Sequence, residues 1–69
     1  MPTLKVMRLQ AHLTVSELAR LANVDRKTVE RAESGQSVLD AKAYAIVEVL
    51  AKRLSREIKF DEVEGLQIL

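Results

Sequence analysis

The chain has 69 residues, a net charge of +1 and no cysteine, and this length suits one small domain. Disulfides and thiolate metal sites are thereby excluded, and the sequence contains neither a signal peptide nor an apolar run of membrane-spanning length. We therefore expect a single cytoplasmic domain over residues 1–69, with no membrane contact, no metal and no other cofactor. Residues 1–31 hold six basic and three acidic side chains, which favours a polyanionic partner for this half.

A first helix is predicted from a Thr3 cap to about Ala11. Its apolar residues recur at helical spacing on one face, and Arg8 lies within that stripe between Met7 and Ala11. A buried arginine needs a carboxylate partner. The alternative is that the long side chain of Arg8 reaches the surface.

Residues 14–35 are predicted to form two short helices joined by a tight turn. Thr14 and Glu17 have the spacing of a capping box at the start of the first of these helices. Asn23 is expected to end it, because asparagine tolerates the left-handed conformation. Ala19 has only a methyl group, at the point where the two helices would come closest. This pattern indicates a helix-turn-helix.

The second helix of the motif is predicted from about Arg26 to Glu33. Asp25 is a suitable N-cap, and Gly35 is suitable for the position after the helix end. Val29 and Ala32 are expected to point inward, because they share one face of this helix.

The outer face of this second helix carries Arg26, Lys27, Glu30 and Arg31. Arginine and lysine are the side chains that pair with the O6 and N7 atoms of guanine. The N-terminal residues of such a helix contact base edges in the major groove. We therefore expect Arg26, Lys27 and Arg31 to contact DNA bases.

The motif resembles the Cro-type phage-repressor (XRE-like) family of helix-turn-helix DNA-binding domains. The family string E-L-A-x-x-A-x-V-x-x-x-T-V-x-x-x-E-x-G is matched by Glu17, Leu18, Ala19, Ala22, Val24, Thr28, Val29, Glu33 and Gly35. The resemblance extends from about Leu4 to Val63. It implies an all-α, four- to five-helix repressor-like fold that binds double-stranded DNA sequence-specifically. It also implies a transcriptional regulator, expected to be a repressor that acts as a homodimer on a two-fold operator.

The resemblance also implies roles for particular residues. It places the family's base contacts on Arg26, Lys27 and Arg31, and it pairs Arg8 with Glu33. Phosphate contacts are expected, from hydroxyls, a side-chain amide and a helix N-terminus, at Thr14, Ser16, Thr28, Ser34 and Gln36. Thr28 has a thymine methyl as its alternative partner. Valine replaces a frequent glutamine at Val15, and the loop after the second helix lacks cations, so weaker binding is expected.

A longer core helix is predicted from about Leu39 to Arg53. Tyr44 and Val49 lie at the edges of its apolar stripe, either as packed residues or as part of a subunit contact. The residues expected to face the core are Leu39, Ala43, Ile46, Val47, Leu50 and Leu54.

The segment 58–69 is a candidate dimerisation tail, because it is apolar for a chain end. Within it, Asp61 and Glu64 have the spacing of a capping box for a short fifth helix, Glu62 to Leu66. Ile68 and Leu69 have no evident cover in a domain of this size.

No pattern for nucleophilic or metal-dependent catalysis is present, since the chain has one histidine, no cysteine and no Gly-rich phosphate loop. An enzyme is therefore not expected. The alternative to DNA binding is a protein-interaction module of antitoxin or adaptor type, which keeps the fold but binds a protein partner. The low net charge favours this alternative, whereas the three cations on one outer face favour DNA.

Overall fold

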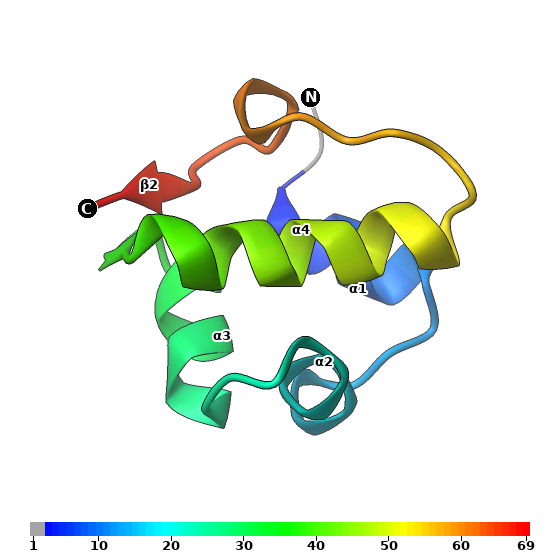
Figure 1. Cartoon of the computed structure of the whole chain (residues 1–69), viewed down its shortest axis with the longest axis horizontal. Helices are drawn as coiled ribbons and strands as arrows, with labels where there is room; N and C mark the ends of the chain where they lie inside the picture. Colours follow the sequence, from blue (N-terminus) through cyan, green and yellow to red (C-terminus); the bar gives the residue numbers. More distant parts are fainter. Residues whose placement is uncertain (1–2) are drawn as a thin grey trace.

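The computed structural model describes residues 3–69, and in them it places four α-helices, one turn of 3-10 helix and two short strands (Figure 1). The elements in chain order are α1 (Leu4–Gln10), α2 (Val15–Ala22), α3 (Arg26–Glu33), β1 (Ser37–Val38), α4 (Asp40–Arg53), η1 (Phe60–Glu62) and β2 (Gln67–Ile68). The predicted all-α class with four helices is confirmed. None of the helices in the described part of the chain combines the length and apolar character needed to cross a membrane.

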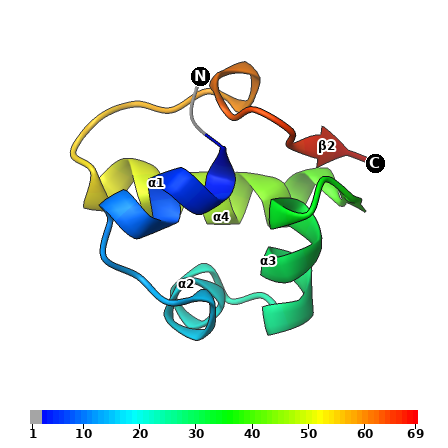
Figure 2. The ribbon, with the colours of Figure 1, turned by 180° about the vertical axis from the view of Figure 1, so that it is seen from behind.

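α4 crosses the middle of the molecule, with α2 and α3 on one side and η1 with β2 on the other (Figure 1). In the view from behind, α1 lies in front of α4, so in Figure 1 it is behind that helix (Figure 2). Each helix contributes its apolar stripe to one shared core, and removal of these stripes from water is the main stabilising term. The most deeply buried side chains include Met7, Leu18, Val29, Ile46 and Leu50, each at most 1% exposed.

The four helices end in the same way, with one residue in the left-handed conformation. The φ angles are +58° at His12, +57° at Asn23, +83° at Gly35 and +55° at Ser55. At each end the next N–H donates to a carbonyl five residues earlier, which is the Schellman arrangement. The predicted ends at Asn23 and Gly35 are confirmed. At the start of α1, the predicted cap Thr3 accepts a hydrogen bond from a backbone N–H.

β1 and β2 form a two-stranded parallel sheet, in which Ser37 lies opposite Gln67 and Val38 lies opposite Ile68. The N–H of Leu69 extends the pairing by donating to the Val38 carbonyl at 2.8 Å. The sequence predicted a polar loop at the first of these segments and an uncovered tail at the second. The loop expectation was wrong, because each segment satisfies the backbone of the other. The expected lack of cover is confirmed for the side chains of Ile68 and Leu69, which are 39% and 79% exposed.

The predicted fifth helix over Glu62–Leu66 is also wrong. The only helical residues in this part of the described chain form η1, which is one turn long and begins earlier, at Phe60. Asp61 lies inside that turn and caps nothing. Gly65 has a φ of +82°, a conformation that a continuing helix does not contain, and it lies in the turn that leads into β2.

Leu39 is the N-cap residue of α4 and is 52% exposed, so its predicted place in the core stripe is wrong. A cap residue has extended backbone angles, so its side chain does not follow the helical spacing that places the other apolar side chains on one face. Val49 is half-buried, whereas Tyr44 is 61% exposed and touches Phe60 edge-to-face, with 6.3 Å between ring centroids.

Candidate nucleic-acid interface

The first helix of the motif, α2, begins with the predicted capping box. The Thr14 N–H donates to Glu17 Oε1 at 2.9 Å, and the Glu17 N–H donates to Thr14 Oγ1 at 3.1 Å. The backbone N–H of Thr14, aided by its side chain, holds the pKa of Glu17 below its ordinary value. A carboxylate at this position also interacts favourably with the helix dipole.

We expect the stabilising effect of Glu17 to depend on pH. A lowered pKa in the folded state means that the carboxylate stabilises the protein above its unfolded-state pKa, about 4.3. This contribution is lost as the pH falls through the lower folded-state value. The stability difference between wild type and Glu17→Ala, from urea unfolding, should therefore shrink in acid. Glu17→Gln keeps an acceptor but has no titrating charge, so its difference from Glu17→Ala should stay constant. Parallel pH profiles for all three proteins would contradict this assignment.

The turn between α2 and α3 brings the two helices into close contact. Asn23 reverses the chain with its left-handed φ, and the Val24 N–H donates to the Ala19 carbonyl at 3.0 Å. Ala19 is 4% exposed, and Val29 and Ala32 from α3 are equally well buried. Ala19 is therefore a small, buried residue of the helix that packs against α3, and its place at the closest approach of the two helices stays a prediction.

Ala19→Leu is expected to destabilise the protein by about 1–3 kcal/mol, because extra volume at a packed contact displaces its neighbours. The α2–α3 angle should change with it, and DNA binding should be lost. Ala19→Ser is the matched control, since it adds one small atom. Thermal unfolding and a mobility-shift assay measure the two effects. An Ala19→Leu variant that kept both properties would show that this contact does not set the motif's geometry.

The structure contains the predicted ion pair between α1 and the end of α3. Arg8 Nε donates to Glu33 Oε2 at 2.6 Å, and Nη2 donates to Oε1 at 3.3 Å. The third donor, Nη1, binds the Leu13 carbonyl at 2.9 Å. The two side chains are only 10% and 12% exposed. This bidentate pair therefore fixes α3 against α1 and against the loop that leads into α2.

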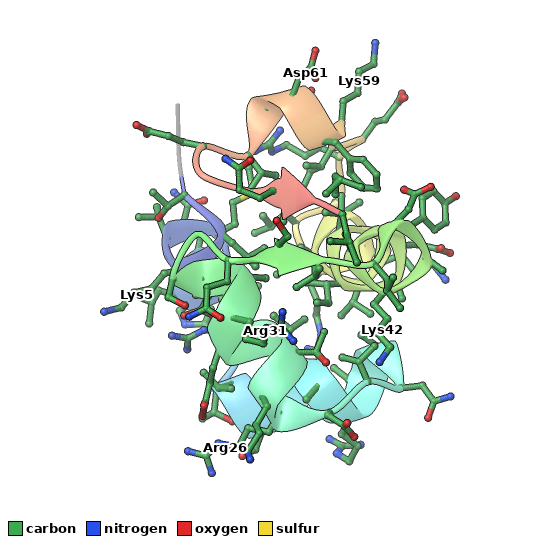
Figure 3. All side chains as sticks on the ribbon, turned by 90° about the vertical axis from the view of Figure 1, so that its left-hand side faces the viewer. Lys5, Arg26, Arg31, Lys42, Lys59 and Asp61 are labelled. Atoms are coloured by element: carbon green, nitrogen blue, oxygen red, sulfur yellow. The ribbon has the colours of Figure 1, made fainter. Side chains whose placement is uncertain are left out.

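The outer face of α3 is cationic and exposed, and Figure 3 looks onto this side of the molecule. Arg26 pairs with Glu30 one turn later at 3.2 Å, and its side chain remains 67% exposed. Arg31 Nη2 donates to the Ser37 carbonyl at 3.1 Å, which directs it toward β1. Lys27 is exposed as well. The three predicted base-contact residues thus share one solvent-facing surface.

Two of the predicted phosphate contacts lie beside the start of α3. Thr14 and Ser16 line a hollow of about 500 Å³ together with His12 and Arg26. The N-terminus of α2 opens into this hollow, and helix N-termini favour anions. Asp25 occupies the predicted N-cap position of α3, but its side chain makes no capping hydrogen bond.

The other predicted phosphate contacts lie along α3 and just after it. Thr28 is half-buried, while Ser34 and Gln36 are exposed. The Ser34 hydroxyl lies 2.9 Å from the Glu30 carbonyl and 3.2 Å from the Arg31 carbonyl. The hydroxyl proton is therefore donated to a carbonyl of α3. Ser34 is for this reason less able than Gln36 to donate a hydrogen bond to a phosphate.

A family model described as helix-turn-helix matches residues 4–56, which is most of the chain. The chain belongs to the XRE-like helix-turn-helix family. The general function of the protein is therefore DNA binding in transcription regulation. Searches among curated proteins and among solved structures found no match.

One basic residue on the α3 side of this XRE-like domain was missed by the sequence analysis. Lys42, in the first turn of α4, lines a small hollow of about 100 Å³ together with Thr28, Arg31, Ser37 and the tail residue Leu69. Figure 3 shows Lys42 on the same side as Arg31. The sequence shows that Lys42 follows soon after the loop that lacks cations, but no local signal places it beside Arg31.

Among residues 3–69, no group of three or more histidine, cysteine, aspartate or glutamate side chains is arranged to hold a metal ion. Val15 occupies the position where the family often has glutamine, and it lies half-buried in the hollow at the start of α2. This XRE-like domain therefore has an apolar side chain where many relatives offer an amide.

Proposed function

We propose that this XRE-like domain binds double-stranded DNA sequence-specifically, with α3 in the major groove, and acts as a transcriptional repressor in the form of a homodimer on a two-fold operator. The observation that carries the proposal is the set of exposed cations on one face of α3, Arg26, Lys27 and Arg31. The buried opposite face of α3 holds this cationic surface outward. A helix presented in this way is suited to the major groove.

We assign base contacts to Arg26, Lys27 and Arg31. In the free protein Arg26 is paired with Glu30, and Arg31 is paired with the Ser37 carbonyl. Both interactions are exposed, and exposed pairs of this kind contribute little to stability. Exchanging them for a guanine edge or a phosphate therefore costs little.

We assign phosphate contacts to residues on both sides of α3. Such contacts fix the register of the protein on the duplex without reading sequence. The residues are Thr14, Ser16, Thr28, Ser34 and Gln36, with Lys42 added because it lies beside Arg31. Lys42 supplies one cation close to the loop that lacks them.

Selection of bound duplexes from a random pool tests the proposal. We expect an enriched site with two-fold symmetry and half-site centres about 34 Å apart, one turn of the DNA. The control is a scrambled duplex of the same composition at two salt concentrations. Equal affinity for the selected and the scrambled duplex would reject sequence-specific binding.

The second candidate function is a protein-interaction module of antitoxin or adaptor type. The observation that favours it is the loop from Ser34 to Ser37, which contains no lysine or arginine. If the random pool yields no enriched site and the protein elutes from heparin at low salt, this function replaces the first.

The proposed homodimer needs an exposed apolar contact, and the tail offers one at the edge of the side that carries Arg31. Ile68 and Leu69 of the tail are 39% and 79% exposed, and Leu39, which lines the same small hollow as Leu69, is 52% exposed. Ile68→Ser with Leu69→Ser keeps the backbone pairing of β2 but removes apolar surface. Sedimentation should then show a weaker dimer, while Leu9→Ser, at a 55% exposed leucine on α1, should show no change. An unchanged association state in the double variant would place the interface elsewhere.

A further inference from the structure

An apolar groove of about 600 Å³ lies between α4 and the segment 57–61. Val47, Ala51 and Ile58 form its apolar lining with Tyr44 and Phe60. Tyr44 is an exposed large apolar side chain of α4, and its ring meets Phe60 edge-to-face. An exposed aromatic residue beside a preformed apolar groove has the character of a binding hot spot.

The groove lies away from the face assigned to DNA. Figure 3 shows Lys59 and Asp61, two of its lining residues, at the end of the molecule opposite to Arg26. The segment that forms one wall of the groove also lies beyond the family match, which ends at residue 56. The groove is therefore a separate surface, formed by α4 within the match and by a segment that follows it.

The charges around the groove define its occupant. Among the described residues that line it, Glu48, Glu57 and Asp61 are acidic and Lys59 is basic. Glu48 is paired with the exposed Lys52 at 3.5 Å, so the uncompensated acidic charge lies at the other wall of the groove, where Glu57 and Asp61 outnumber Lys59. An acidic rim around an apolar floor is complementary to an apolar segment flanked by cations.

We propose that this groove is a docking site for a protein partner, which contributes a short amphipathic helix whose apolar anchors are flanked by lysine or arginine. The anchors would pack against Val47, Ala51 and Phe60, and the cations would lie beside Glu57 and Asp61. Helix-in-groove recognition requires an apolar groove of this kind with anchors on one helical face. The groove volume accommodates a few large side chains.

A second copy of this chain is a poorer electrostatic match for the groove than a basic segment, because its patch has one lysine for three carboxylates. In a two-fold contact the same surface patch lies on both subunits. Glu57 and Asp61 of one copy would then approach the same acidic rim of the other copy, which is unfavourable. The charge pattern therefore selects a basic partner rather than self-association.

Panning a displayed library of random peptides about 16 residues long, roughly four helical turns, against the full chain without DNA tests the proposal. We expect the enriched peptides to carry leucine or aromatic anchors flanked by lysine or arginine. Titration of the leading peptide into labelled wild-type protein should shift amide signals of α4 and of residues 57–61. Because no DNA is present, failure of the DNA proposal and failure of this proposal give different results.

Two surface variants isolate the groove. Tyr44→Ala and the double variant Glu57→Lys with Asp61→Lys should each weaken the leading peptide by about tenfold or more. Glu64→Lys is the matched control, since Glu64 is exposed and does not line the groove. Each of these positions is exposed, so thermal unfolding should confirm that the folds are intact. If a variant does not fold, the shift map on wild type decides alone.

Several results would overturn the proposal. These are enriched peptides without basic residues, amide shifts outside the groove, or binding that is equal for wild type and both variants. A selection without any enriched peptide would do the same. A wild-type dimer that Tyr44→Ala dissociates would assign the groove to a second copy.

Discussion

Glu33→Ala is expected to destabilise the protein by about 3–5 kcal/mol, because the buried guanidinium of Arg8 then loses its carboxylate. Arg8 would retain its bond to the Leu13 carbonyl, but its Nε and Nη2 donors, which now bind Glu33, would be unsatisfied. A loss of this size is a large part of the stability of a chain this short. Urea and thermal unfolding measure it directly.

The double variant Arg8→Met with Glu33→Leu is the matched control. Replacing both members of a buried pair with apolar residues of similar size typically costs far less than removing one. We expect the double variant to be more stable than Glu33→Ala. If Glu33→Ala unfolds at the wild-type urea concentration, the pair behaves as a surface contact and does not fix α3 against α1.

Arg26→Ala and Arg31→Ala are each expected to relax base preference at one position of each half-site, a G·C pair. A bidentate arginine–guanine contact discriminates against a wrong base by about 1–3 kcal/mol. Loss of a phosphate contact instead weakens binding to every sequence alike. Mobility-shift titrations of each variant against the selected site and its single-base variants separate the two outcomes.

Lys27→Ala and Lys52→Ala complete this series. Lys27 suits either a guanine edge or a phosphate, so its profile shows which of these it contacts. Lys52 lies at the far end of α4 with its side chain 78% exposed, and its removal should leave base preference unchanged. An unimpaired triple variant of Arg26, Lys27 and Arg31 would reject α3 as the recognition helix.

Much of the fold could be predicted because its signals are local. The capping box of Thr14 and Glu17, the left-handed residues Asn23 and Gly35, and the helical spacing of apolar residues each act within a few positions of the chain. The Arg8–Glu33 pair is not local. It was predicted because a buried charge requires a partner, and the family resemblance indicated which one.

The sheet and the tail could not be predicted for the opposite reason. A two-residue strand is too short for an alternating pattern of polar and apolar side chains. The pairing of Ser37 with Gln67 depends on how the segment after α4 returns the chain to β1, which no local signal encodes. The same limit applies to Lys42, because its proximity to Arg31 depends on how α4 starts relative to α3.

The parallel pairing of β1 with β2 has a consequence for the order in which the protein folds and for its local opening. The two strands are separated in the chain by the whole of α4, so closing this contact costs more loop entropy than any contact within the helix-turn-helix. We expect the sheet to form after the helices and to open before them. In native-state hydrogen exchange, the amide of Leu69 should exchange through local opening, whereas those of Val29 and Leu50 should require global unfolding. The hollow beside Arg31 would then exist in an open and a closed form, in rapid equilibrium on the DNA-facing side.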